Sequence, residues 1–124
     1  MNEKDEVKVI KDQLGSPTYA ADLAEAIFNI IANCHLEIYN WDPGIYNFSN
    51  EGIISWYDFA RAIKEITNSP CDVKPISTAE YPTHAKRPAY SVLDKTKIEK
   101  TFGIKLKKWK GSLAFCIEKI ENNH

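Results

Sequence analysis

Short runs of β-branched residues alternate with amphipathic stretches along this chain of 124 residues. Such an alternation predicts strands and helices packed in layers, because each kind of element must bury its apolar side against another element. The predicted strands are 7–11, 45–48 and 73–76, and the predicted helices are 18–35, 55–66, 94–102 and 113–120. The sequence therefore predicts an α/β fold, or α+β for a piece of this size, with few short strands and about four helices.

Several helix limits have their own signals. Ser55 and Asp58 have the spacing of a capping box, with Asp in place of the usual Glu. Asp94 is placed to cap a helix that Gly103 would end. Four apolar residues recur at helical spacing in the first helix, which predicts one buried stripe: Leu23, Ile27, Ile30 and Ile31.

The composition excludes several classes of function. Sixteen basic and seventeen acidic side chains give a net charge of -1, without the basic excess of a nucleic-acid-binding protein. No run approaches the roughly 18 apolar residues of a membrane span, and the charged N-terminus does not resemble a secretion signal. The three cysteines never pair as C-x-x-C, and the three histidines lack zinc-site spacing. We therefore expect a cytoplasmic protein that binds no metal, nucleic acid or membrane.

The sequence also lacks the motifs of a complete oxidoreductase or nucleotide-binding site. Its five glycines lie too far apart for a phosphate-binding loop. None of its six tyrosines is followed by lysine four positions later, and the nearest case is Tyr57 with Arg61. We therefore assign no catalytic residue and no cofactor-binding residue to the chain.

A polar segment, 12–18, follows the first predicted strand, at the end where ligands usually bind in α/β sheets. Gln13 can offer an amide to a ligand, and Ser16 or Thr18 can offer a hydroxyl. The alternative is that Ser16 or Thr18 caps the following helix.

Two further candidates lie elsewhere in the chain. Arg87 belongs to the long proline-containing segment 77–90, and its planar guanidinium suits a bidentate contact with phosphate. The alternative is an ordinary surface arginine. Trp56 could stack on a base or a sugar, but an aromatic residue at a helix start also serves as a core or staple residue.

Three ordered blocks resemble a known family. Residues 12–24 are similar to its DQ-x-GSPT…DLA segment, residues 48–60 to FS-x-x-G-x-x-SWY-x-FA, and residues 76–94 to IST-x-EYPT…RP-x-xS-x-LD. The family is that of the dTDP-4-dehydrorhamnose reductases, which are extended short-chain dehydrogenases. His84 stands where the family often has proline.

This resemblance implies a function for the chain as part of a larger enzyme. Family members use NADPH to reduce the 4-keto group of dTDP-4-dehydro-L-rhamnose, the last step of dTDP-rhamnose synthesis in bacteria. Their glycine motif and Tyr-x-x-x-Lys pair lie in an N-terminal Rossmann domain. Residues 1–124 would then be the C-terminal substrate-binding domain without that NADPH-binding domain, and would bind no cofactor and be inactive alone.

The resemblance also gives roles to the candidate residues. It places Arg87 at an arginine that contacts the diphosphate of the sugar nucleotide, and it places Gln13 and Thr18 in the block that lines the substrate cleft. Two alternatives stay open: a non-catalytic module like the regulatory β subunit of methionine adenosyltransferase, or part of a related sugar-nucleotide epimerase or reductase. We also expect a homo-oligomer, formed through the surface that the missing domain would leave exposed.

Overall fold

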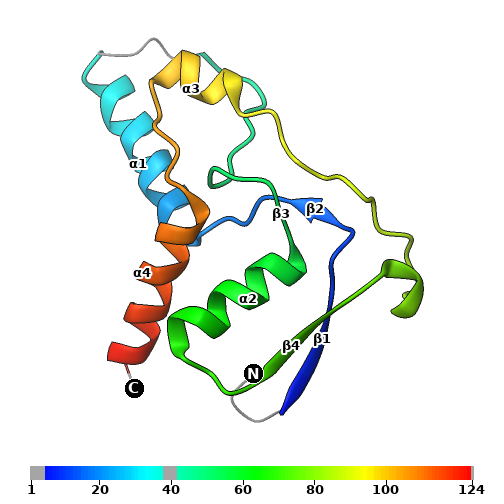
Figure 1. Ribbon diagram of the computed structural model, residues 1–124. Coiled ribbons are helices and arrows are strands. Elements are labelled where there is room, and N and C mark those ends of the chain that lie inside the picture. Colours follow the sequence, from blue (N-terminus) through cyan, green and yellow to red (C-terminus); the bar gives the residue numbers. More distant parts are fainter. Residues whose placement is uncertain (1–4, 38–41, 124) are drawn as a thin grey trace.

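The computed structural model describes residues 5–37 and 42–123 and has the predicted mixed α/β character, with four α-helices and few short strands (Figure 1). In chain order the elements are β1 (Glu6–Ile10), β2 (Leu14–Gly15), α1 (Ala20–His35), β3 (Ile54–Ser55), α2 (Trp56–Thr67), β4 (Asp72–Ile76), the 3-10 turn η1 (Thr78–Glu80), α3 (Thr96–Phe102) and α4 (Trp109–Asn122). Among the described helices, none has the length and apolarity needed to cross a membrane.

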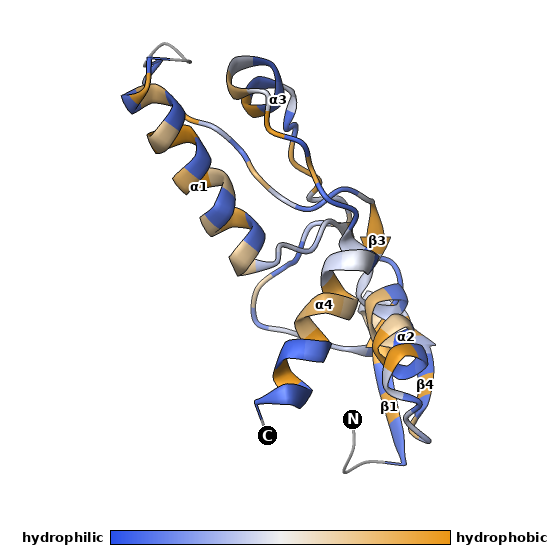
Figure 2. Cartoon of the chain, turned by 90° about the vertical axis from the view of Figure 1, so that its left-hand side faces the viewer, coloured by the Kyte–Doolittle hydropathy of each residue, from blue (hydrophilic) through white to orange (hydrophobic). Residues whose placement is uncertain are grey.

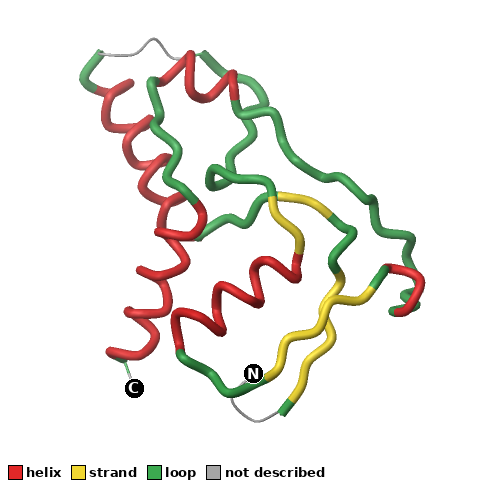
Figure 3. Tube along the Cα trace, viewed as in Figure 1, coloured by secondary structure: helices red, strands yellow, loops and turns green. Residues whose placement is uncertain are grey.

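Two small sheets organise the described strands. β1 pairs in parallel with β4, from Glu6 opposite Asp72 to Ile10 opposite Ile76. β2 pairs antiparallel with β3. Helix α2 packs against β1 and β4, and α4 in turn contacts α2 (Figures 1 and 3). This helix-on-sheet layer supports β2 and β3, which lie at its upper end in Figure 1.

The apolar core is small and made largely of small side chains. Its buried apolar residues are Ala26, Ala60, Ala62, Cys71, Val73, Ile98, Phe102 and Leu113. Much of α1 stays outside this core: Ile27, Phe28 and Ile31 are exposed, with Phe28 at 74%. Orange segments along α1 in Figure 2 mark its apolar residues. The predicted buried stripe is therefore wrong in part, because no described element covers this face of α1.

The local helix signals are mostly confirmed. The Ser55 N–H donates to Asp58 Oδ2 at 2.9 Å, and the Asp58 N–H donates to Ser55 Oγ at 3.1 Å, which completes the capping box. Helix α3 ends at Gly103 as predicted, but its N-cap is Lys95 rather than Asp94. The Asp94 carboxylate still accepts the Thr96 N–H at 2.9 Å.

The predicted strand 45–48 is wrong. Lys97 Nζ donates to the carbonyl oxygen of Ile45 at 3.1 Å, so a side chain occupies an acceptor that a strand partner would have used. The Tyr46 ring packs on Phe102, with 5.0 Å between ring centroids. This segment is thus fixed by its contacts with α3 and forms no ladder. The final helix begins at Trp109 rather than Leu113, and the Trp109 ring packs near Phe59 of α2, with 6.2 Å between ring centroids.

Candidate functional site

A cavity of about 530 Å³ opens beside β2 and β3, at the start of α2. Four of the five predicted binding residues line it, and they come from three separate parts of the sequence. The lining consists of Gln13, Leu14, Gly15, Ser16, Pro17, Ile54, Ser55, Trp56, Phe59, Arg87, Pro88 and Ser91. Thr18 is exposed and does not line the cavity.

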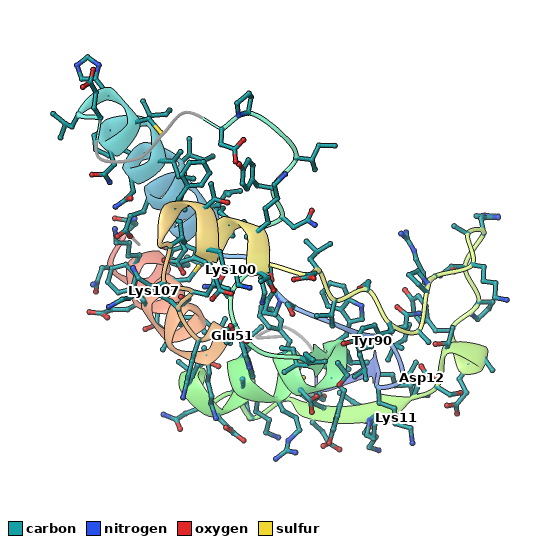
Figure 4. The ribbon with its side chains drawn as sticks, turned by 90° about the horizontal axis from the view of Figure 1, so that it is seen from above. Lys11, Asp12, Glu51, Tyr90, Lys100 and Lys107 are labelled. Carbon is teal, nitrogen blue, oxygen red and sulfur yellow. The ribbon has the colours of Figure 1, made fainter. Side chains whose placement is uncertain are left out.

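One wall of the cavity is a narrow ribbon of three segments. β2 lies between β3 and the returning end of segment 77–91, which forms a parallel bridge from Leu14 to Tyr90. The Leu14 N–H donates to the Ala89 carbonyl at 2.8 Å, and the Ser91 N–H donates to the Leu14 carbonyl at 2.9 Å. Figure 4 shows Tyr90 and Asp12 on the same side of the molecule. The ribbon therefore brings the segment that carries Arg87 to the segment that carries Gln13.

The approach of the chains at this ribbon explains one glycine. A Cβ on Gly15 would lie 2.8 Å from Ser91 Oγ, closer than real Cβ atoms come to other heavy atoms. The space beside Gly15 is thus filled by the protein's own chain. It is not an open cradle of the kind that glycines form around a dinucleotide pyrophosphate.

The segment after β2 is held by the loop that precedes β3. Ser16 Oγ donates to the Gly52 carbonyl at 2.6 Å, and the Asn50 N–H donates to the Pro17 carbonyl at 3.1 Å. The N-cap of α1 is Tyr19, whose N–H donates to Asn50 Oδ1 at 2.7 Å. The interpretation of Ser16 or Thr18 as a helix cap is therefore wrong, because a side chain from a distant loop takes that place.

Asn50 is the centre of a buried polar network that the sequence did not reveal. It is 1% exposed, and its Nδ2 lies 2.7 Å from Asp22 Oδ2, 3.1 Å from Ser112 Oγ and 3.2 Å from the Lys107 carbonyl oxygen. The Ser112 hydroxyl also donates to Asp22, and Lys95 Nζ donates to the Asn50 carbonyl. Glu51 forms a parallel bridge with Lys108, just before α4, and its N–H donates to the carbonyl of Lys107, which Figure 4 labels. The network joins α1, the 49–52 loop and α4.

Electrostatics favours the ionised form of the carboxylate in this network. Burial raises the pKa of Asp22, but hydrogen bonds from Ser112 and Asn50 and the positive charge of Lys107 outweigh burial. Its pKa is therefore lower than the ordinary value, and Asp22 stays charged at neutral pH. Lys107 Nζ lies 3.5 Å from Asp22 Oδ1 and 3.1 Å from Glu25 Oε2.

The cavity itself presents one cation, one large ring and polar groups. Arg87 is exposed and makes no ion pair with any described residue. Trp56 is the first residue of α2 and is 61% exposed, so it is not the core residue of the alternative interpretation. Gln13 Nε2 reaches Thr78 Oγ1 at 3.4 Å. An unpaired guanidinium beside an indole and an amide can hold an anionic ligand that also has a ring.

A metal centre needs clustered ligating side chains, and a dinucleotide needs an open backbone cradle for its pyrophosphate. No cluster of three or more His, Cys, Asp or Glu side chains is placed to hold a metal ion within residues 5–37 and 42–123. At Gly52 the space for a Cβ is taken by the Trp109 ring, 2.3 Å away, just as Ser91 fills the space at Gly15. Neither Gly15, which lines the cavity, nor Gly52 therefore offers the open backbone cradle that a dinucleotide pyrophosphate needs.

Comparison with known proteins agrees with the three blocks of the sequence. The family model described as the RmlD substrate binding domain matches residues 1–122. The spore coat polysaccharide biosynthesis protein SpsK of Bacillus subtilis is 43% identical over 110 residues, which are 89% of this chain and 36% of that protein. The dTDP-4-dehydrorhamnose reductase of Aggregatibacter actinomycetemcomitans is 43% identical over 118 residues, which are 89% of this chain and 39% of the reductase.

Solved structures give the same result. A dTDP-4-dehydrorhamnose reductase from Clostridium acetobutylicum matches with a TM-score of 0.84 and 38% identity, over 96% of this chain and 40% of its own. The reductase from Bacillus anthracis, in complex with NADP, matches with a TM-score of 0.79 and 37% identity, over 94% of this chain and 39% of its own. The chain spans less than half the length of each of these relatives. The fold, the three sequence blocks and the family model agree, and the chain belongs to the RmlD substrate binding domain family.

Proposed function

We propose that residues 1–124 are the sugar-nucleotide-binding domain of an NADPH-dependent dTDP-4-dehydrorhamnose reductase, which reduces dTDP-4-dehydro-L-rhamnose to dTDP-L-rhamnose. The observation that carries the proposal is the cavity, because it gathers Gln13, Ser16, Trp56 and Arg87 from three distant segments. Family membership supports the substrate class, since relatives over this region are reductases of that name.

Each lining residue has a chemical role in this proposal. The Arg87 guanidinium binds the diphosphate, because its planar donors match phosphate oxygens. Trp56 offers an exposed ring for stacking on the sugar or the base. Gln13 and Ser16 contact ligand hydroxyls, with Ser16 acting as an acceptor because its own proton is used on the Gly52 carbonyl. Thr18 lies outside the cavity lining, so the proposed site does not include it.

The chain is proposed to orient the substrate and not to perform the chemistry. Hydride transfer needs NADPH and a proton donor, and neither Gly15 nor Gly52 offers the backbone cradle that the dinucleotide needs. Orientation lowers a barrier only where the reacting groups are present. The isolated chain is therefore expected to bind no NADPH and to oxidise none in the presence of the keto sugar nucleotide. Measurable NADPH oxidation by this chain alone would contradict this part of the proposal.

Calorimetric titration with dTDP tests the binding role. The unchanged chain is expected to bind, and Arg87→Ala is expected to lose about tenfold or more in affinity, the value of a charge-assisted contact. Arg61→Ala is the matched control, because this substitution also removes one exposed positive charge. Arg61 itself pairs with Glu65 on α2 and lies outside the cavity lining. Equal losses in both variants would show a general charge effect and contradict the site.

The result of the same titration separates the alternatives. No affinity for dTDP together with a stable protein partner would favour a non-catalytic interaction module, like the regulatory β subunit of methionine adenosyltransferase. Tighter binding of another nucleoside diphosphate, such as UDP, would favour a related epimerase or reductase. Free cysteines at positions 34, 71 and 116 fit the proposed cytoplasmic location, where thiols stay reduced.

We also propose that the chain self-associates through the exposed apolar face of α1. Ile27, Phe28 and Ile31 lie on this helix and are half-exposed or more, and covering them with a second copy removes apolar area from water. Sedimentation should show a concentration-dependent oligomer that Phe28→Asp weakens. Tyr81→Asp, at an exposed residue of the 77–90 segment, is the control. A monomer at every concentration would contradict the proposal.

A further inference from the structure

The residues 78–91, here called the strap, carry Arg87 to the cavity but have little packing of their own. Residues 79–91 are exposed apart from their backbone contacts with β2, and Figure 3 shows a long loop from η1 toward α3. At its far end the strap is tied to Leu14 by two backbone hydrogen bonds. At its near end the strap continues from β4, where the Ile76 carbonyl accepts the Lys11 N–H at 2.9 Å. The first turn beyond β4 is closed by the Ser77–Glu80 capping box and is tied to the segment before β2 through Thr78.

Asp12 holds that near end. The Thr78 N–H donates to Asp12 Oδ1 at 2.9 Å and lies 3.1 Å from Oδ2, and the Thr78 hydroxyl donates to Oδ1 at 2.5 Å. A carboxylate accepts through two oxygens, so one side chain engages both donors of Thr78. Both ends of the strap are thus fixed to the short segment 12–14, and the strap closes into a loop beside the cavity.

The same contact reaches a second residue of the cavity. Thr78 Oγ1 gives its proton to Asp12 and accepts from Gln13 Nε2 at 3.4 Å. Asp12 therefore sets the direction of the Thr78 hydroxyl, and the hydroxyl in turn sets the Gln13 amide. One carboxylate outside the cavity lining is thus connected, through Thr78, to the Gln13 side chain within it.

We infer that Asp12 is a positioning residue for ligand binding: through Thr78 it holds the strap so that Arg87 faces the cavity, and it orients Gln13 toward the ligand. The inference rests on the proposed function, because it takes the diphosphate of a nucleotide as the group that Arg87 binds. It adds a residue that contacts neither the ligand nor the cavity. Removing the Asp12 carboxylate frees the near end of the strap, while its far end stays bonded to Leu14 and the fold stays in place.

Calorimetry with two ligands tests this role. Asp12→Ala is expected to weaken dTDP binding about tenfold, the factor of one charge-assisted contact, and to leave thymidine, which has no diphosphate, within about twofold. Thr78→Ser keeps both donors and is expected to bind dTDP like the unchanged chain. In the Arg87→Ala background, Asp12→Ala is expected to add much less than tenfold, because only the part of its effect that passes through Gln13 remains. Additive losses, or equal losses for thymidine and dTDP, would overturn the inference.

A measurement without ligand tests the strap alone. Trypsin can cut after Lys86, within the strap, and Asp12→Ala is expected to speed this cleavage several-fold while Thr78→Ser does not. Asp72→Ala is the matched control, since Asp72 is an exposed carboxylate on β4 that pairs with Lys74 instead. If Asp12→Ala is cleaved at the unchanged rate, the inference is overturned, whatever affinity for dTDP the variant shows in calorimetry.

The two measurements separate the two proposals. Faster cleavage in Asp12→Ala without any dTDP binding by the unchanged chain would overturn the proposed function and support the hold of Asp12 on the strap. Tight dTDP binding by both the unchanged chain and Asp12→Ala would support the proposed function and overturn the inference.

Discussion

Asn50→Ala is expected to lower the free energy of unfolding by about 4 kcal/mol, a large effect for a single polar residue. The Asn50 side chain is buried and has partners on three sides. Its Oδ1 accepts the Tyr19 N–H at 2.7 Å, and its Nδ2 lies 2.7 Å from Asp22, 3.1 Å from Ser112 and 3.2 Å from the Lys107 carbonyl.

The magnitude follows from what each partner loses. A hydrogen bond to an ionised group contributes about 1.5–3 kcal/mol, and Asp22 is ionised. The Tyr19 N–H loses its partner, at about 1–3 kcal/mol for a buried group left unsatisfied, whereas the Lys107 carbonyl keeps the Glu51 N–H at 2.9 Å. Part of that cost is recovered as the remaining groups rearrange. A domain of this size has about 5–15 kcal/mol in total, so the variant stays folded but marginal.

Urea unfolding at 25 °C, followed by far-ultraviolet circular dichroism, measures the loss. The matched control is Asn33→Ala, because among the described residues the Asn33 amide bonds to Asn29 of the same helix, in contacts exposed to solvent. We expect the control to change stability by less than about 0.5 kcal/mol. A loss below about 1.5 kcal/mol for Asn50→Ala, with unchanged dependence on urea, would refute the role given to this network.

Three further outcomes are expected. Gly52→Ala should cost about 3 kcal/mol in the same unfolding assay, because φ there is +126° and a Cβ would meet the Trp109 ring at 2.3 Å; a loss under about 1 kcal/mol would contradict this. The hydroxyl and N–H of Thr78 lower the pKa of Asp12 from its ordinary 3.8, so the stability that Asp12 adds is present above pH 3.8 and is lost as the pH falls through the lowered value. In a carboxyl NMR titration, Thr78→Val should move the pKa of Asp12 back toward 3.8, and an unchanged pKa would contradict the contact. Trp56→Ala should change the unfolding free energy by less than about 1 kcal/mol, since Trp56 is largely exposed. A greater loss would show that Trp56 is a core residue.

Features with local causes could be predicted from the sequence. The capping box of Ser55 and Asp58 and the helix end at Gly103 each depend on residues a few positions apart, and both are present. The prediction of a strand at 45–48 was wrong because it depended on a residue far away in the sequence. A strand needs a partner from elsewhere in the chain, and here Lys97 and Phe102 of α3 hold the segment instead.

The candidate site shows the same division. Residue chemistry was enough to single out Gln13, Ser16, Trp56 and Arg87, which all line one cavity. Asn50 and the contact of Asp12 with Thr78 could not be found in this way, because they join residues 28 to 66 positions apart in the sequence. The helical spacing in α1 identified an apolar stripe correctly, but spacing does not say what covers it.

The most direct test is a map of backbone amide shifts in the chain as dTDP is added to about 5 mM, well above the concentration that a micromolar site requires. If the cavity is the nucleotide site, the largest saturable shifts will lie in residues 13–16 and at Trp56 and Arg87, and α1 will serve as an unchanged reference. No saturable shift, or shifts concentrated on α1 and α4, would contradict the assignment of this cavity to the sugar nucleotide.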